Sequence, residues 1–272
     1  MVLIPKGRSP KVIFVLLVCA AVGFAEGASS ESAAAEQELF RMINHERAHA
    51  GVAELQWNEW LAQAARKHAE EMARRGQLAH QFPGEPGLRE RIAATKLRFN
   101  ASAENVAFGP TPAGITDDWM HSPGHRANIL DGQYNAIGVA VARRGDELYA
   151  VTDFAHSVPN LSASEMEDAV GAAINQARKA RSLPALPRRQ DPTLRQFACE
   201  MAKNDRLDTS AILGRGNVSA SLAFTDPDPA KFGSHFRDVA NVATSKAFAV
   251  GACYARSDTY VEGTNWVVVA FY

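Results

Sequence analysis

The sequence has no excess of charge of either sign and no block of like charges. Its 29 Lys and Arg residues nearly balance its 30 Asp and Glu residues, which gives a formal net charge of -1. Nucleic-acid-binding proteins carry a basic patch that neutralises phosphates, so this balance argues against a DNA or RNA partner. With 46% apolar and 22% charged residues, the 272-residue chain has the composition of a globular protein and enough length for about two domains.

The sequence also has no apolar run long enough for a comfortable membrane span. The apolar run at residues 12–25 is short, follows three basic residues and precedes the small and polar residues 26–30. This order of basic, apolar and small residues is typical of a secretory signal. We therefore expect residues 1–25 to be a signal peptide, cleaved near Ala25, and the mature protein to be secreted, periplasmic or extracellular without a membrane span.

Cysteine is scarce in this chain. Of its three cysteines, Cys19 falls within the expected signal, which leaves Cys199 and Cys253. An even number of cysteines in an exported protein is compatible with one disulfide, here between these two residues. The first half of the mature chain has no cysteine, so we expect its stability to come from the hydrophobic core alone.

Apolar residues recur at helical spacing in the first part of the chain. They predict a helix over 38–50, preceded by a short leader at residues 29–36. A second helix should begin after Asn58, a good N-cap residue, and end at Gly76. A short third helix is expected over 88–94.

The following segment changes from helical to alternating apolar spacing. Thr111 followed by proline is typical of a helix start, and the helix that begins there should end at Ser122. Alternating residues at 137–141 and 147–155, around the turn Gly145-Asp146, predict an antiparallel hairpin. Helices followed by a hairpin indicate an α+β domain.

After a polar linker at residues 157–165 the pattern starts again. The matching segments follow one another in the same order in both halves, with Ile174-Asn175 and Arg178 against Ile43-Asn44 and Arg47, Leu183 to Leu186 against Val52 to Leu55, and Val250-Gly251-Ala252 against Ile137-Gly138-Val139. Because the offset is nearly constant, we expect an internal repeat that has diverged in its middle. The expected domains are residues 36–157 and 164–272.

Residues 119–130 read Trp-Met-His-Ser-Pro-Gly-His-Arg-Ala-Asn-Ile-Leu and concentrate two histidines around a Ser-Pro-Gly break. Pro123 has no backbone N–H and disfavours helical backbone at Ser122, while Gly124 tolerates positive φ. We therefore expect the preceding helix to stop here and a loop to present His125.

Four polar residues lie at the ends of the expected elements, namely His80, Glu104, Asp117 and His125. Two neutral imidazoles with one or two carboxylates would form a divalent-metal site, in which nitrogen ligands favour zinc. His80, His125 and Glu104 are the expected ligands. The same set could instead serve as an acid/base pair.

Three other histidines are expected to have no ligand role. His68 lies on the apolar face of the second helix, where a core histidine with a satisfied hydrogen bond is the simplest interpretation. His121 is expected to face solvent. In the second half, His235 has no acidic counterpart of Glu104 upstream, so we expect that half to be inactive and to serve structure or interaction.

Residues 119–130 resemble the signature of the CAP superfamily, which includes cysteine-rich secretory proteins, insect venom antigen 5 and plant pathogenesis-related proteins. The resemblance is to its bacterial secreted branch and spans roughly residues 38–155. Further matching segments come in the family's order: Ile43-Asn44 with Arg47, Leu55 with Trp57, His68-Ala69 with Met72, Leu78-Ala79-His80, Ala103-Glu104-Asn105-Val106-Ala107 and Ile137-Gly138-Val139.

The resemblance implies an α-β-α sandwich with a small antiparallel sheet and a shallow cleft lined by two histidines and two acids. It implies this sandwich twice, with a degenerate second copy, because the second half resembles the family only in its framework. His80 and His125 match the family histidines, and Glu104 matches its first acid. Ser122 stands where many eukaryotic members place the second acid, a glutamate, and Asp117 on the preceding turn is the expected substitute. The disulfide-linked extensions of the animal branch should be absent, since their cysteines are.

Members of this family have been linked to sterol or lipid binding, to divalent-metal binding and to proteolysis. The favoured hypothesis is an exported protein whose cleft binds a small ligand, a lipid, an envelope component or Zn²⁺ without catalysis, because the sequence has no Gly-x-Ser-x-Gly motif and the first domain no cysteine. One alternative is a metal-dependent hydrolase in which Glu104 is the general base for a metal-bound water. The other is an envelope interaction protein in which the cleft is vestigial.

Overall fold

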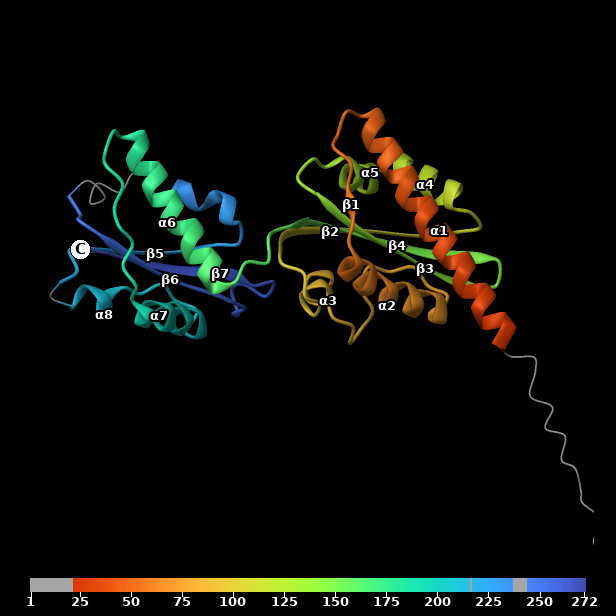
Figure 1. Cartoon of the computed structure of the whole chain (residues 1–272). Helices are drawn as coiled ribbons and strands as arrows, with labels where there is room; N and C mark the ends of the chain where they lie inside the picture. The colour runs from red at the N-terminus through yellow and green to blue at the C-terminus, as the bar shows by residue number, and fades with distance from the viewer. Residues whose placement is uncertain (1–21, 216, 237–243) are drawn as a thin grey trace, which may run out of the picture.

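A computed structural model describes residues 22–215, 217–236 and 244–272 of the chain. Most of the expected signal peptide, including Cys19, therefore lies outside the described residues. The described residues form two successive halves, each with a mostly antiparallel sheet and several helices (Figure 1). This agrees with the expected α+β class. No helix among the described residues is long and apolar enough to cross a membrane.

The first half is built on a four-stranded sheet in the order β1-β3-β4-β2. Only β1 is parallel to its neighbour. The strands are β1 (Gln56–Trp57), β2 (Phe99–Gly109), β3 (Ala136–Arg144) and β4 (Glu147–Ser157). The predicted hairpin is confirmed as β3 and β4, and β2 forms an edge of the sheet next to β4.

Helices cover both faces of this sheet (Figure 1). On one face lie α1 (Val22–His49), α4 (Pro112–His121) and α5 (Pro123–Leu130), and on the other lie α2 (Glu59–Arg75) and α3 (Leu88–Ala93). The two faces have separate cores, one around Leu39, Trp119 and Phe154 and the other around Met72 and Phe82. The first half is thus a sheet between two helical layers.

The first helix is longer than predicted. Residues 29–36 are part of α1 rather than a leader. Glu36 is 6% exposed and accepts a hydrogen bond from the backbone N–H of Val141 on β3, with an N to Oε1 distance of 3.1 Å. This contact with a residue distant in sequence adds to the packing of the extra turns on the sheet.

The second helix begins and ends where its sequence predicts. The Asn58 side chain accepts hydrogen bonds from the N–H groups of Trp60 and Leu61, and Gly76 ends the helix with a left-handed φ of 64°. The helix lies very close to β3 at Gly138, where an added Cβ would stand 2.1 Å from the backbone nitrogen of Ala62. Glycine is therefore required at this crossing.

The Ser-Pro-Gly corner does not form the expected loop. The helix α4 ends as predicted, but α5 begins at once with Pro123 at its first position. Ser122 separates the two helices with an extended backbone, at φ -88° and ψ 117°. The N–H of the first helical residue has no partner within the helix. Proline, which has no N–H, can therefore begin a helix as well as end one. His125 consequently lies in the first turn of a helix.

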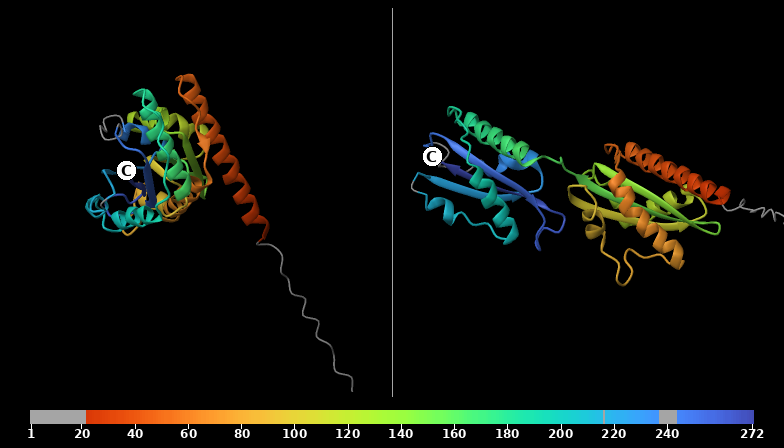
Figure 2. Two further views of the ribbon diagram at one scale, coloured as in Figure 1. Left: turned by 60° about the vertical axis from the view of Figure 1, so that its left-hand side comes forward. Right: turned by 60° about the horizontal axis from the view of Figure 1, so that its bottom comes forward.

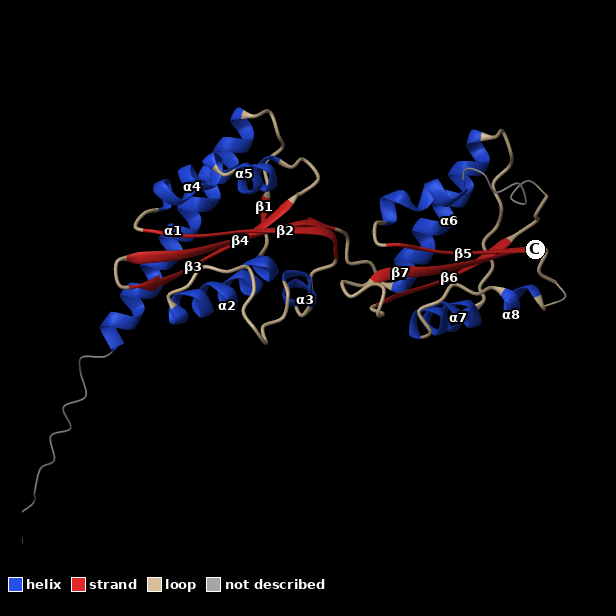
Figure 3. Cartoon of the chain, turned by 180° about the vertical axis from the view of Figure 1, so that it is seen from behind, coloured by secondary structure: helices blue, strands red, loops and turns tan. Residues whose placement is uncertain are grey.

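The second half has a three-stranded antiparallel sheet in the order β5-β7-β6. Its strands are β5 (Ala220–Asp226), β6 (Phe248–Ala255) and β7 (Thr264–Phe271), and its helices are α6 (Ala163–Ala180), α7 (Pro192–Lys203), α8 (Ser210–Leu213) and the 3₁₀ helix η1 (Pro229–Phe236). Figure 2 shows this half end to end with the first. Seen from behind in Figure 3, α6 lies on one face of the sheet and α7 and α8 on the other.

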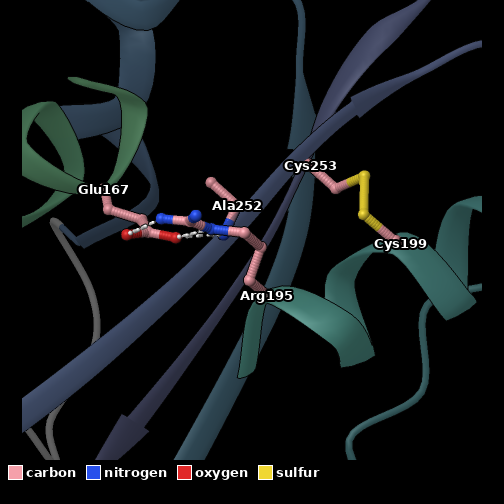
Figure 4. The surroundings of a disulfide bond; sticks show 5 residues. All are labelled: Glu167, Arg195, Cys199, Ala252 and Cys253. Carbon is pink, nitrogen blue, oxygen red and sulfur yellow. Dashed lines mark hydrogen bonds and ion pairs between the residues drawn. A yellow bond between two sulfur atoms is a disulfide. The ribbon is translucent and has the colours of Figure 1, made fainter. Parts of the chain in front are cut away.

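Cys199 on α7 and Cys253 on β6 form a disulfide, with an S–S distance of 2.08 Å (Figure 4). It links a helix to the sheet across 54 residues of chain. The first half has no such covalent link among its described residues, so its helices are held on the sheet by noncovalent contacts.

Candidate functional site

Glu104 on the edge strand β2 forms one hydrogen-bonded group with His80 and Arg91. The Glu104 side chain is 3% exposed, whereas the His80 side chain is 62% exposed. His80 Nδ1 lies 2.9 Å from Glu104 Oε1, and the Arg91 guanidinium donates to Glu104 Oε2. Since an ionised carboxylate only accepts hydrogen bonds, the proton lies on His80 Nδ1 and the Nε2 lone pair of the neutral ring is left for a ligand.

Arg91 also fixes the loop that carries His80. Its guanidinium donates to the carbonyl oxygen of His80 at 3.3 Å and to that of Pro86 at 3.2 Å. Arg91 comes from the short helix α3 and is 8% exposed. The position of the His80 ring is therefore set from two sides, through its backbone by Arg91 and through its side chain by Glu104.

His125 faces His80 from the first turn of α5. The two ring centroids are 6.5 Å apart, with an angle of 50° between the ring planes. Asn105 donates a hydrogen bond to the carbonyl oxygen of His125 at 3.0 Å, and Asn128 donates to Asn105 Oδ1 at 2.9 Å. These amides connect α5 to β2. We call His80, Glu104 and His125 the His80–His125 site.

The surroundings of His80 and His125 shift their pKa values in opposite directions. The hydrogen bond to Glu104 raises the pKa of His80 above its ordinary value, against an opposing effect of burial. Burial lowers the pKa of His125, and the nearby charge of His80 lowers it further. As the pH falls, His80 therefore takes up a proton before His125 does.

A second buried acid, Asp153 on β4, lies beside Glu104. The two residues are direct partners in the pairing of β2 with β4. Asp153 is 0% exposed, and neither of its carboxyl oxygens has a hydrogen-bond partner among the described residues. Burial raises the pKa of Asp153 well above its usual range, and the charge of Glu104 raises it further. Asp153 is thus a buried acid behind the site whose surroundings favour its protonated form.

Asp153→Asn should make the protein more stable at neutral and alkaline pH. An acid whose pKa is higher in the folded than in the unfolded chain stabilises the fold only while it is protonated. The free energy of unfolding of the wild type should therefore fall as the pH rises from about 4 through the raised pKa of Asp153. Asparagine cannot ionise, so the variant should lack this loss.

Urea unfolding of both proteins between pH 5 and pH 9 measures the effect. The expected result is a stability difference in favour of Asp153→Asn that grows with pH. Asp146→Asn, in the turn between β3 and β4, is the control and should follow the wild type. Parallel stability curves for Asp153→Asn and the wild type would show that Asp153 is ionised at no cost.

Asp117 does not join the site as expected. Its carboxylate lies 3.3 Å from His121 Nδ1 on the same helix, and its side chain is 71% exposed. The helix α4 turns this residue toward solvent. Asp153, rather than Asp117, is the second acid next to Glu104.

The expectations for two other histidines are confirmed. His68 is completely buried, with Nδ1 2.7 Å from Glu85 Oε1 and Nε2 2.7 Å from the carbonyl oxygen of Ala79. Both ring nitrogens are therefore occupied, which leaves none for a ligand. The His121 side chain is 77% exposed.

The site can offer one nitrogen of each of two imidazoles to a ligand. Glu104 contributes less, because one of its oxygens contacts His80 and the other Arg91. Among the described residues, no group of three or more His, Cys, Asp and Glu side chains is arranged to hold a metal ion. The arrangement suits an ion or ligand bound by two imidazoles, with its remaining positions open.

Comparison with known proteins finds one family model that matches the first half of the chain. Residues 40–154 match the model of CAP, the cysteine-rich secretory protein family. YkwD of Bacillus subtilis (strain 168) is 31% identical over 119 residues, which are 43% of this chain and 46% of YkwD. The membrane protein YlbC of the same organism is 29% identical over 111 residues, 40% of this chain and 32% of YlbC. The chain thus spans less than half the length of these relatives.

Among solved structures, an extracellular protein containing an SCP domain from Bacillus anthracis is 24% identical. The match covers 48% of this chain and 43% of that protein, with a TM-score of 0.45. The family match ends at residue 154, before the second sheet begins.

Proposed function

Residues 40–154 are a CAP domain of the cysteine-rich secretory protein family, and from this premise we propose that the chain is an exported binding protein. In this proposal the His80–His125 site holds a small ligand or a divalent cation and catalyses no reaction. The observation that carries the proposal is the pair of facing imidazoles, one of them oriented by a buried glutamate that is itself held by Arg91. Export is supported by the signal-like order of residues 1–30.

The residues of the site fit a zinc ion that is bound loosely. His80 and His125 would hold it, and Glu104 would orient His80 as a hydrogen-bonded partner behind the ligand. A structural zinc site has four protein ligands, whereas two imidazoles leave positions open for water or for an oxygen atom of a ligand. A bound ion would supply a positive centre that attracts such oxygen atoms.

The position of Glu104 argues against the hydrolase alternative. A general base must be within reach of the proton that it takes and must be free to accept it. Both oxygens of Glu104 are occupied, and its side chain is 3% exposed. Cys199 and Cys253 are joined in the disulfide, so neither offers a nucleophile. Binding therefore suits this geometry better than acid/base chemistry does.

Zinc titration of the full chain by calorimetry tests the proposal. We expect the double variant His80→Ala with His125→Ala to bind one zinc ion fewer per chain than the wild type. Glu104→Gln should keep the ion but weaken its binding about tenfold or more, because the orienting partner of His80 is lost. Binding should also weaken as the pH falls, since only unprotonated imidazole binds zinc and the pKa of His80 is raised.

His121→Ala and His235→Ala are the matched controls. The first removes an exposed histidine from the same half, and the second removes the histidine of the other half. Both should leave the number of zinc ions unchanged. A double variant His80→Ala with His125→Ala that binds as many zinc ions as the wild type would refute the metal part of the proposal.

We further propose that residues 164–272 are a degenerate copy of residues 36–157. In both halves an asparagine on the long helix donates a hydrogen bond to the backbone of a leucine and accepts one from the same backbone. An arginine one turn later donates through Nε to the carbonyl oxygen of the residue six positions further along the chain. These contacts join Asn44 with Leu55, Arg47 with Ala53, Asn175 with Leu186 and Arg178 with Pro184. Such specific contacts at matching positions favour duplication over chance similarity.

The copy does not extend to the site. Gly138 and Gly251 both stand where a strand touches a helix backbone, so they align the two sheets. In the first sheet Gly138 is paired with Asp153, which is paired with Glu104. The corresponding residues of the second sheet are Val268 and Ala223, which carry no acid. His235 contacts Asp226 at 3.0 Å instead, and we propose that this half serves structure or interaction.

A further inference from the structure

The last turns of α1 carry two histidines, His45 and His49, at the spacing of one helical turn. Arg47, midway between them, is completely buried and points into the protein. With about 3.6 residues per turn, residues two positions before and after Arg47 lie on the opposite face of the helix. Both histidines are exposed, and the His45 side chain is 67% exposed.

The Nε2 atom of each ring faces the Nε2 atom of the other. His45 Nε2 and His49 Nε2 are 3.2 Å apart, and the ring centroids are 4.3 Å apart. Two nitrogens bound to one tetrahedral ion at about 2.0–2.1 Å each lie about 3.4 Å from one another. The nitrogens therefore already have nearly the separation that a shared ion requires, and they approach each other on the solvent side.

We propose that His45 and His49 form a second site for a divalent transition-metal ion, on α1 and independent of the His80–His125 site. Two neutral imidazoles suit Zn²⁺, Ni²⁺ and Cu²⁺, and the separation of the two Nε2 atoms is compatible with the tetrahedral geometry of Zn²⁺. Water fills the remaining positions, so the ion exchanges readily. The two Nε2 atoms share one hydrogen bond, and the ring that donates it binds the metal after its proton has moved to Nδ1.

The measurement is the number of zinc ions bound by the full chain after equilibrium dialysis. We compare the wild type, His45→Ala with His49→Ala, His80→Ala with His125→Ala, and the variant that carries all four changes. We expect two ions on the wild type, one on each double variant and none on the fourfold variant. In the His80→Ala with His125→Ala background, loss of either His45 or His49 alone should weaken zinc binding at least tenfold, because one ligand remains.

The control variant His121→Ala with His156→Ala removes the same number of histidines from other exposed or half-exposed positions, and should keep both ions. Circular dichroism of every variant checks that the helices are intact. If His45→Ala with His49→Ala binds as many ions as the wild type, the two rings share only a hydrogen bond and the second site does not exist. This outcome is independent of the His80→Ala with His125→Ala result, which tests the proposed function.

Discussion

Arg47→Met should lower the free energy of unfolding by about 3 kcal/mol or more. The Arg47 side chain is completely buried and donates to four carbonyl oxygens from outside its own helix. The donor–acceptor distances are 2.7 Å to Ala53, 2.7 Å to Ile129, 2.9 Å to Asp131 and 3.3 Å to Tyr134. Methionine fills much of the same volume but donates no hydrogen bond, so these carbonyls lose their charged donor.

The same change should disturb the His80–His125 site. Ile129 and Asp131 lie at the end of α5, the helix whose first turn carries His125. Without Arg47 the last turn of α5 loses its anchor on α1, and zinc binding should weaken together with stability. Urea unfolding gives the stability, and calorimetry with zinc gives the affinity.

Arg41→Met is the matched control for this prediction. Arg41 is an exposed residue of the same helix whose Nε donates to the carbonyl oxygen of Gln37 on that helix, at 3.3 Å. A surface change of this kind should alter stability by at most about 0.5 kcal/mol. If Arg47→Met costs no more than Arg41→Met, the four hydrogen bonds of Arg47 do not support the fold.

Gly138→Ala should also cost about 3 kcal/mol or more, through packing rather than hydrogen bonding. The added Cβ would stand 2.1 Å from the nitrogen of Ala62 and 2.2 Å from the carbonyl carbon of Leu61, and backbone cannot move aside as a side chain can. The helix α2 would have to shift away from β3. Gly251→Ala should have a similar cost, because its Cβ would stand 2.1 Å from the carbonyl carbon of Leu194.

Gly132→Ala provides the control, since a Cβ there meets no atom within 4 Å and the residue has no positive φ. It should leave the unfolding midpoint within the range of ordinary surface changes. Thermal unfolding of the three variants separates the cases. A wild-type midpoint for Gly138→Ala would mean that α2 and β3 are not in the close contact described above.

The ends of α2 could be predicted because their signals are local. The predictions for residues 29–36 and for the segment after Ser122 were wrong because these segments depend on long-range contacts. Asn58 and Gly76 act on backbone groups within a few residues, so their effect is visible in sequence. Residues 29–36 are helical, and their last residue, Glu36, contacts Val141. This contact joins residues more than a hundred positions apart, so it is not visible in the local sequence. Pro123 is compatible both with the end of one helix and with the start of the next, and only the packing of α5 decides between them.

The candidate site was predictable to the extent that it follows a recognisable motif. His80, Glu104 and His125 come together as the resemblance implied, although Asp117 does not. Asp153 was missed because its position beside Glu104 depends on the register of β2 and β4. Its sequence signal was an acid inside the apolar strand segment 149–155. Arg91 had no such signal, since an arginine in a short helix is common on protein surfaces.

The most direct test of the proposed function is imidazole NMR of the full chain during zinc titration, with each histidine assigned through its alanine variant. We predict that the ring nitrogens of His80 and His125 shift together at the same zinc concentration, while those of His68 and His121 stay unchanged. Unchanged His80 and His125 signals at saturating zinc, or a shift of only one of them, would contradict a shared site.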